Sequence, residues 1–340
     1  MPSWLKRTLL ISMLAVVLAV IATGLWLNQR YQQFLATPLA LPDQGVDYTL
    51  APGTSLRAVA SDLVQRGWLT EPLQLRWLAR QENLATRIRA GEYFVPAGTT
   101  PREFLEILIS GRERQYAITL LEGWNIRELR AAVAADPILE QTLKDADNQQ
   151  LMAALGKPDL HPEGRFLPDT YHFPRGEKDI DLYRRAFVGM EQVLAEEWSA
   201  RSAGLPLNSP DEALTLASII EKETGAAAER PEIAGVFVRR LQKGMLLQTD
   251  PTVIYGLGEG FDGNIRRSDL RTDTPYNTYT RKGLPPTPIA MPGRAAIHAA
   301  LHPADGKALY FVAQGNGTHY FSATLEEHNA AVRKYQLGGN

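Results

Sequence analysis

The chain has no cysteine and no excess of charge of either sign. Without cysteine it can form no disulfide, no thiolate metal site and no cysteine nucleophile. Lysine and arginine number 36 against 38 aspartates and glutamates, so no basic field favours nucleic acid as a partner. Its 340 residues are enough for two or three domains and a sizeable core.

Signatures of two common enzyme classes are also missing. There is no G-x-S-x-G elbow and no phosphate-binding glycine loop, which argues against an α/β-hydrolase and an NTPase. His298 and His302 are four residues apart and could share a helix face, as zinc ligands do. That segment lacks the internal glutamate of metalloproteases and offers no third ligand. Capping or packing is therefore favoured, and no metal or other cofactor is predicted.

A long uncharged run lies near the N-terminus. Residues 9–27, LLISMLAVVLAVIATGLWL, number 19, close to the roughly 20 apolar residues that cross a bilayer core as a helix. Trp4 and Trp26 flank the run, where amphipathic rings prefer the membrane interface. Lys6 and Arg7 precede it, which favours an N-terminus on the inner side of the membrane. The alternative is a cleaved signal peptide.

After a polar spacer with two prolines (28–44), a strand, a glycine turn and an amphipathic helix recur from Val46, Glu92 and Ala117. The natural N-caps are Thr54 or Ser55 and Thr99 or Thr100, and Pro101 suits a first helical turn. The first two copies resemble the LysM module, a small βααβ domain that binds glycans rich in N-acetylglucosamine. The third leads into the next domain.

Residues 161–174, HPEGRFLPDTYHFP, are dense in proline, glycine and aromatic residues, so no regular element is expected there. Loops on a scaffold often carry function, which makes Glu163 and Asp169 secondary candidates for substrate binding. The alternative is a loop that packs down as a brace.

Residues 208–225, NSPDEALTLASIIEKETG, predict a complete helix. Ser209 is the N-cap, Pro210 takes the first position, and Glu212 stands where a capping box needs it. Gly225 follows the last turn as a stop signal. The helix therefore ends in the sequence EKE.

The helical period separates the last three charged residues. With the apolar face centred near Leu216 and Ile220, Glu223 extends that face, whereas Lys222 points away and can screen Glu221 on the flank. Partial desolvation raises the pKa of a carboxyl group, and a carboxyl that stays protonated at neutral pH can act as a general acid. A solvated helix end is the alternative.

Polar and aromatic segments follow, at 248–256 and 274–293. Amides, hydroxyls and aromatic rings on loops are the usual lining of a carbohydrate groove. The predicted groove residues, with roles in binding or transition-state support, are Gln248, Asp250, Thr252, Tyr255, Tyr276 and Asn277. The alternative is a proline-stiffened loop with structural tyrosines.

Four segments in this order, EGRFLPDTY (163–171), ASIIEKET (217–224), LQTDPTVIYGLG (247–258) and YNTYTRKGLPPTPIAMPG (276–293), closely resemble the endolytic murein transglycosylase family, also called the YceG-like or MltG family. LYFVAQGNGTHYFSATLEEHN (309–329) fits as well. The resemblance covers nearly the whole chain, including the uncharged N-terminal run.

This resemblance implies a lyase that cuts the β-1,4 bond between N-acetylmuramic acid and N-acetylglucosamine in nascent peptidoglycan and leaves 1,6-anhydromuramoyl ends. The family's catalytic glutamate corresponds to Glu223, and Thr224 stands where related enzymes often carry serine. One carboxyl group suffices for this reaction. Asp250 or Glu163 could supply a second one, so lysozyme-like hydrolysis stays open, as does a non-catalytic glycan-binding scaffold.

The predicted fold class is α+β. The predicted parts are a cytoplasmic N-terminus (1–8), a transmembrane helix (9–27), a linker (28–44), a LysM-like subdomain (45–115) and a larger mixed α+β catalytic domain (116–340). The expected location is the bacterial inner membrane, as a single-pass protein with its catalytic domain in the periplasm. The expected partners are peptidoglycan strands, the membrane and peptidoglycan synthases.

Overall fold

The structure, a computed structural model, describes residues 3–338, with side chains from residue 7 onward. The structure does not describe residues 1–2 and 339–340, or the side chains of Trp4 and Lys6. The first residues of the predicted segment 1–8 and the last two of the predicted segment 116–340 therefore lie outside the described residues. The chain divides into two compact units. Unit 1 contains the residues up to Tyr116 with Phe173–Arg175, and unit 2 contains Ala117–His172 and the residues from Gly176 onward.

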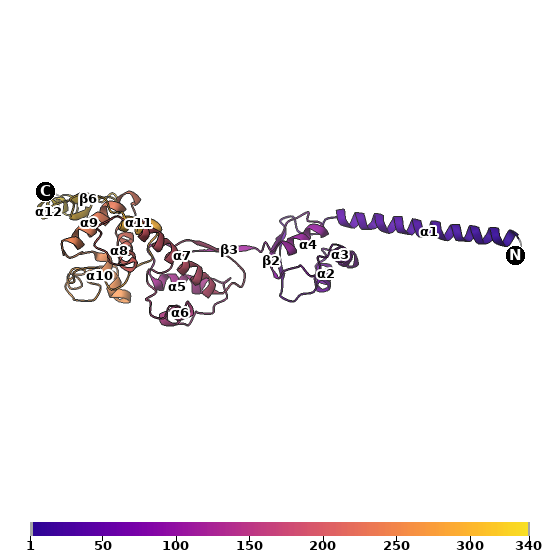
Figure 1. Ribbon diagram of the computed structural model, residues 1–340, viewed down its shortest axis with the longest axis horizontal. Coiled ribbons are helices and arrows are strands. Elements are labelled where there is room, and N and C mark those ends of the chain that lie inside the picture. The colour runs from indigo at the N-terminus through magenta and orange to yellow at the C-terminus, as the bar shows by residue number, and fades with distance from the viewer. Residues whose placement is uncertain (1–2, 339–340) are drawn as a thin grey trace. The chain divides into compact units, whose positions relative to one another are not determined.

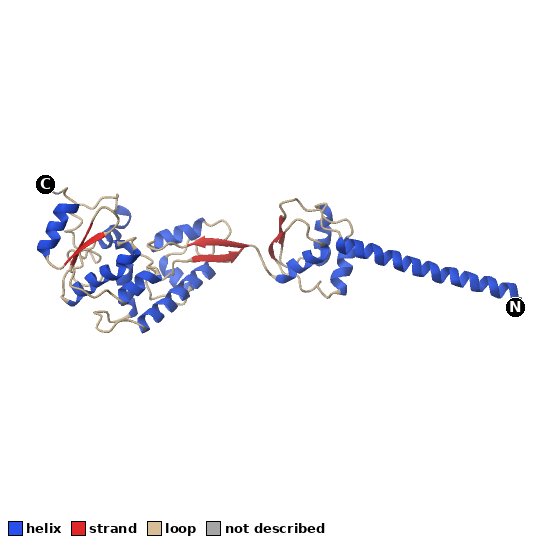
Figure 2. Ribbon diagram, turned by 90° about the horizontal axis from the view of Figure 1, so that it is seen from above, coloured by secondary structure: helices blue, strands red, loops and turns tan. Residues whose placement is uncertain are grey.

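The elements of unit 1 are, in chain order, α1 (Ser3–Ala36), β1 (Val46–Leu50), α2 (Leu56–Gln65), α3 (Pro72–Gln81), β2 (Gly91–Val95) and α4 (Pro101–Ser110). Two further strands, β3 (Gln115–Thr119) and β4 (Thr170–Pro174), pair with each other and contain the points where the chain passes between the units. Figure 2 shows the strands as three separate pairs.

The uncharged run lies within α1, which is one continuous helix (Figure 1). Residues 7–36 are long and apolar enough to cross a membrane, and no part of their most apolar window is buried inside the protein. A membrane anchor and a signal sequence both fit this finding. The helix continues to Ala36, through the first half of the predicted linker. It does so because no proline occurs between Ser3 and Pro38 and because Phe34 is buried in the core of unit 1.

Unit 1 has the βααβ order predicted for residues 45–115. β1 and β2 are antiparallel, with Val46 opposite Val95 and Leu50 opposite Gly91. The apolar faces of α2, α3 and α4 close one core with the strands. Its largest fully buried side chains include Tyr48, Tyr93 and Phe104. The resemblance of this unit to a glycan-binding module stays a prediction.

Of each pair of predicted N-cap residues, the second residue forms the cap. Ser55 accepts a hydrogen bond from the backbone nitrogen of Ala58 at 3.3 Å, after a turn in which Gly53 takes a φ of +77°. Thr100 forms a full capping box with Glu103, so α4 begins at Pro101, as the sequence predicts.

The elements of unit 2 are α5 (Ile126–Ala135), α6 (Asn148–Ala154), α7 (Asp179–Ser199), α8 (Pro210–Glu223), the 3₁₀ turn η1 (Ala227–Glu229), α9 (Arg230–Gln242), α10 (Asp250–Leu257), the 3₁₀ turn η2 (Gly258–Gly260), α11 (Arg294–Leu301), β5 (Tyr310–Ala313), β6 (His319–Ser322) and α12 (Leu325–Tyr335). α8 is the central helix and contacts α7, α9, α10 and α11. The antiparallel hairpin β5–β6 packs on α12, and β5 also contacts α9.

The 161–174 segment is more regular than its composition suggests. Its last five residues form β4 and pair with β3, which shows that the expectation of a wholly irregular segment was wrong there. The alternation of Tyr171 and Phe173 with polar neighbours suits a strand, and Phe173 is fully buried.

Candidate active site

Local hydrogen bonds set both ends of α8. The hydroxyl of Ser209 accepts from the backbone nitrogen of Glu212 at 3.2 Å, as predicted. The Glu212 carboxylate does not close a capping box on Ser209, because it accepts from the backbone nitrogen of Asn208 at 2.7 Å. The helix stops at Thr224, which is extended (φ −145°) and whose hydroxyl accepts from the backbone nitrogen of Ala226. Gly225 therefore supplies no left-handed stop.

Neighbouring helices cover α8 on every side. All residues from Ala213 to Ile220 are buried. The prediction that α8 buries only one apolar face was therefore too narrow. The polar members of this run bond to the backbone: Thr215 donates to the carbonyl oxygen of Asp211, and Ser218 donates to that of Thr215. A rigid, buried helix thus fixes the position of Glu223 in its last turn.

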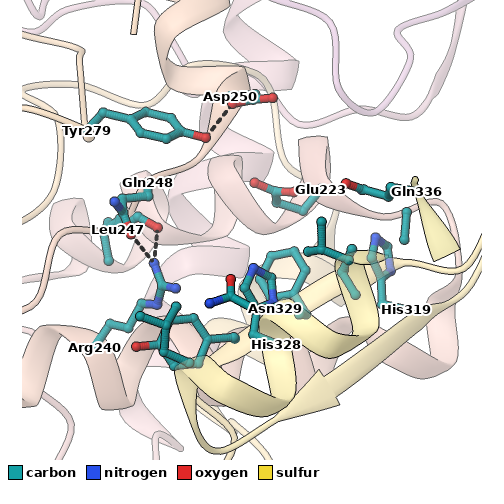
Figure 3. A pocket seen from close by; sticks show the side chains of 16 residues that line it. Glu223, Arg240, Leu247, Gln248, Asp250, Tyr279, His319, His328, Asn329 and Gln336 are labelled. Atoms are coloured by element: carbon teal, nitrogen blue, oxygen red, sulfur yellow. Dashed lines mark hydrogen bonds between the residues drawn. The ribbon is translucent and has the colours of Figure 1, made fainter. Parts of the chain in front are cut away.

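Glu223 lines a cavity of about 550 Å³ at the end of α8. The α8–α10 region forms one side of the cavity, and the β5–β6 hairpin with α12 forms the other (Figure 3). The polar side chains that line it with Glu223 are Arg240, Gln248, Asp250, Tyr279, Tyr310, His319, His328, Asn329 and Gln336. The Glu223 side chain is partly buried and faces this space.

The surroundings of Glu223 favour its protonated form. Burial raises the pKa of Glu223 to about 7, and the nearby charge of Asp250 acts in the same direction. The hydroxyl of Thr249, which donates to Oε1, opposes this shift, as do the charges of His319 and Arg240. A carboxyl group with this pKa carries its proton in about half of the molecules at neutral pH, which suits both release and uptake of a proton.

Arg240 organises the segment that faces Glu223. Its guanidinium donates to the carbonyl oxygens of Leu247 at 2.8 Å and Leu309 at 2.7 Å, so it ties the 246–248 loop to the start of the β5–β6 hairpin. Gln248 is the last residue of this loop and has a φ of +53°, a conformation rare for residues other than glycine. Strain of this kind persists only where the surroundings hold it, and it is frequent in binding sites.

Asp250 is held by Tyr279, whose hydroxyl donates to Oδ1 at 2.6 Å (Figure 3). Across the cavity, His319 is fixed by Glu229, which accepts from the His319 backbone nitrogen and contacts Nδ1, both at 2.8 Å. Burial lowers the pKa of His328, so this ring is neutral at pH 7. Within residues 3–338, Nδ1 of His328 is buried without a hydrogen-bond partner.

Two of the predicted groove residues, Gln248 and Asp250, share the cavity with Glu223. Thr252, on α10, and Asn277 do not line it, because both side chains are fully buried. Thr252 bonds to the carbonyl oxygen of Thr249 and to the hydroxyl of Thr278. Thr252 thus supports the segment that carries Thr249. The side-chain amide of Asn277 donates instead to the carbonyl oxygens of Asp269 and Thr272, so neither residue is a direct contact of a ligand in this cavity.

Glu163, Tyr255 and Tyr276 form a separate cluster, in which the two tyrosines are partly buried. Glu163 is fully buried and accepts from the backbone nitrogen of Ile126 at 3.1 Å and from the Tyr255 hydroxyl at 2.9 Å. Burial raises the pKa of Glu163 to about 7. The Tyr255 ring lies 4.9 Å from that of Tyr276, whose hydroxyl bonds to Thr287. Glu163 thus caps α5, which explains its burial better than substrate contact does.

Asp169 lies apart from both groups. It is exposed at the start of β4, where its carboxylate accepts from the backbone nitrogen of Thr170.

Glu221 was predicted to lie on the flank of α8, screened by Lys222, and its surroundings in the structure are different. Its side chain is 6% exposed and pairs with Arg230 at 3.2 Å, whereas Lys222 donates to the carbonyl oxygen of Gly123 and does not screen it.

A third potential metal ligand, which the sequence did not reveal, lies beside His298 and His302. Glu197 brings the ligand atoms of all three residues within 4.8 Å of one another. The carboxylate is held by Arg294 at 2.9 Å and by Nδ1 of His298 at 2.8 Å. The ring nitrogens of His302 face the carbonyl oxygens of Ala200 and His298. These contacts describe a packing network, and they occupy most of the atoms that a metal would need.

Most residues of the cavity wall were not predicted from the sequence. Arg240, Tyr279, His319 and His328 were not assigned, although the last three lie in segments that the family resemblance included. The histidine and the two aromatic residues of THYF (318–321) were a usable signal, but nothing local to them indicates that the hairpin folds back to face Glu223.

Comparisons with known proteins agree with this resemblance. A model of the YceG-like family matches residues 48–334. An endolytic murein transglycosylase of Bacillus subtilis is 33% identical over 85% of this chain and 84% of its own length. One of Streptococcus pneumoniae is 25% identical over 94% of this chain, which spans 64% of that longer protein. The crystal structure of a yceG-like protein of Listeria monocytogenes has a TM-score of 0.55 and 28% identity, over 85% of this chain and 99% of its own. The chain belongs to the YceG-like family.

Proposed function

We propose that this protein is a membrane-anchored endolytic peptidoglycan transglycosylase, a lyase with Glu223 as its only proton-transfer residue. The observation that carries the proposal is a glutamate at the end of a rigid buried helix, with its pKa raised to about 7, facing a polar cavity of about 550 Å³. The names of the Bacillus and Streptococcus relatives support the choice of peptidoglycan as the substrate.

The reaction uses one carboxyl group twice. Protonated Glu223 donates its proton to the oxygen of the β-1,4 bond between N-acetylmuramic acid and N-acetylglucosamine as the C1–O bond breaks. The new carboxylate then takes the proton of the muramoyl 6-hydroxyl, whose oxygen attacks C1. The product is a 1,6-anhydromuramoyl end, and no water is consumed. Because Thr249 contacts Oε1, we assign the transfer to Oε2.

The other polar residues of the cavity bind sugar and do not move protons. Asp250 and Gln248 present oxygen and amide groups to the hydroxyls of a glycan, and the Tyr279 hydroxyl orients Asp250. Arg240 is held by backbone carbonyl oxygens and supplies a positive charge near the carboxylate that forms during the reaction.

A muramidase is the second candidate, and it is favoured by the second carboxyl group in the same cavity. A hydrolase needs two carboxyl groups, one acid and one nucleophile or base. Asp250 could act as the nucleophile or base, with Glu223 as the acid. Its Oδ1 already accepts the Tyr279 hydroxyl, and that contact supports a binding role instead.

Digestion of purified glycan strands by the full chain, followed by mass spectrometry of the new ends, tests the proposal. We expect anhydromuramoyl ends from the wild type and a loss of at least 10³-fold with Glu223→Gln, in line with removal of a general acid. The matched control is Glu326→Gln, an exposed glutamate that does not line the cavity, and it should keep full activity. Reducing muramoyl ends would establish hydrolysis instead, and intact strands would favour a non-catalytic glycan-binding scaffold.

The location follows from the same proposal. With α1 across the inner membrane and Arg7 on its cytoplasmic side, the two units lie in the periplasm, where nascent strands are made. Crosslinking and co-purification with peptidoglycan synthases tests the expected partnership. Repeated absence of the synthase from crosslinked material would count against it.

A further inference from the structure

One face of α3 carries apolar and basic side chains that nothing in unit 1 covers. Leu73 and Trp77 are 72% and 56% exposed, and they lie four residues apart on one side of the helix. Arg76 and Arg80 are exposed on the same side. We name these four residues the α3 face. Large apolar side chains gathered on one exposed side of a helix commonly mark a contact surface.

Charge on this face is unbalanced. The sequence of α3, PLQLRWLARQ, has no acidic residue, and within residues 3–338 neither Arg76 nor Arg80 has an ion-pair partner. The neighbouring α2 differs, because its flanking Arg66 pairs with Asp62 at 2.9 Å. Two free guanidinium groups beside a tryptophan and a leucine suit a partner that is both apolar and anionic.

α3 lies across the end of α1. Arg30 of α1 pairs with Glu71, the N-cap of α3, at 3.2 Å. The next residue, Tyr31, donates from its hydroxyl to Gln81, the last residue of α3, also at 3.2 Å. The ends of a ten-residue helix are about 15 Å apart, and consecutive side chains of α1 diverge by about 100°, so contacts to both ends of α3 favour helices that cross. These contacts occur within one turn or so of Leu27, where the apolar run ends.

The crossing also fixes which way the α3 face points. The opposite side of α3, with Leu75, Leu78 and Ala79, is buried in the core of unit 1, and that core lies beyond the C-terminal end of α1. The α3 face therefore looks back along α1 toward its N-terminus. Figure 1 shows α3 on the side of unit 1 from which α1 extends.

We propose that the α3 face is a second membrane contact, which lies flat on the bilayer surface and binds anionic phospholipid headgroups through Arg76 and Arg80 while Leu73 and Trp77 enter the interface. The proposal rests on α1 being a membrane anchor, as proposed above. A helix that crosses a transmembrane helix at its exit lies in the plane of the bilayer, and tryptophan and arginine are the residues that favour this depth. Trp26, with Arg30 5.4 Å from its ring, sits close to the same level on α1.

The absence of cysteine makes a direct test possible. Single cysteines replace Leu73, Trp77, Phe94 or Leu18 in the full chain, each carries a nitroxide label, and the protein is reconstituted in vesicles of phosphatidylglycerol and phosphatidylethanolamine. Accessibility to oxygen and to a water-soluble nickel chelate reports the depth of each label. Phe94 is the matched control, an aromatic residue of β2 that is 52% exposed in the same unit.

We expect labels at 73 and 77 to collide more with oxygen than with the chelate and the label at 94 to do the reverse. Arg76→Gln and Arg80→Gln should each lower the docked population about fivefold in anionic vesicles and have no effect in neutral ones. Labels at 73 and 77 that match the label at 94 would overturn the docking proposal. The label at 18 distinguishes failure of the anchor proposal from failure of the docking proposal. If that label collides mainly with the water-soluble chelate, α1 does not span the bilayer.

Discussion

The hydroxyl of Thr249 is the contact through which the proton affinity of Glu223 can be changed most cleanly. It donates to Oε1 of Glu223 and is the strongest influence that opposes the raised pKa. Thr249→Val removes the hydroxyl but keeps the shape of the side chain, and the backbone of Thr249, which bonds to Thr278 and Thr252, is unchanged. Loss of a bond to the charged form must raise the pKa further.

The size of the shift follows from the energy of the lost bond. A hydrogen bond to a charged group contributes roughly 1.5–3 kcal/mol, and about 1.4 kcal/mol corresponds to one pKa unit, so the pKa should rise from about 7 to about 8 or above. At pH 8 the wild type then has about a tenth of its Glu223 protonated and the variant about half, roughly a fivefold gain in the active form.

The assay is the pH dependence of kcat/KM for release of anhydromuramoyl ends, which reports groups of the free enzyme. The basic limb of the profile should move up by at least one pH unit in Thr249→Val. The control is Thr215→Val on α8, because that buried hydroxyl bonds to the carbonyl oxygen of Asp211 and does not touch Glu223. A limb that stays in place, or moves to lower pH, refutes the assignment of that limb to Glu223.

Two further predictions concern stability. Burial raises the pKa of Glu163 from 4.5 in the unfolded chain to about 7 in the folded protein, so the folded state holds this proton more tightly. The free energy of unfolding is therefore highest, with respect to this group, below about pH 4.5, and it falls by about 3 kcal/mol as the pH rises through about 7. Glu163→Gln should remove that fall. In urea unfolding, the difference in the free energy of unfolding between the variant and the wild type should then change from pH 5 to pH 8, and a difference that stays constant would contradict this prediction. Leu216→Ala should destabilise unit 2 by about 2–5 kcal/mol, because Leu216 is fully buried in α8. Val188→Ala, at a 55% exposed position, should cost about 0.5 kcal/mol or less, and equal costs for the two would show that α8 is not a core element.

Several features followed from local sequence because local interactions create them. The caps Ser55, Thr100 and Ser209 each accept from the backbone nitrogen three residues later, and the structure has each of them. The raised pKa of Glu223 was also predicted, since its cause, burial, follows from its place beyond Leu216 and Ile220 on the helix. Segment-level resemblance then identified the family without any structural information.

Other predictions failed where the deciding contact came from far along the chain. Glu163 looked like a loop residue but lies buried under Tyr255, 92 positions later. Thr252 and Asn277 are the right residue types for a groove, yet both are buried, because Thr252 on α10 packs against Thr278 and the Asn277 amide bonds to the backbone of Asp269 and Thr272. Side-chain chemistry alone does not tell which side of a loop is solvated.

The sequence by itself determined an apolar N-terminal helix, a βααβ unit and a helix that ends in a desolvated carboxyl group, because hydrophobic period, capping and turn chemistry act over a few residues. Only the tertiary structure decided what surrounds that carboxyl. Arg240 holds the 246–248 loop, Tyr279 holds Asp250, and the β5–β6 hairpin brings His319 over the cavity. These contacts join segments separated by up to about a hundred residues, and their geometry is set by the packing of helices around α8.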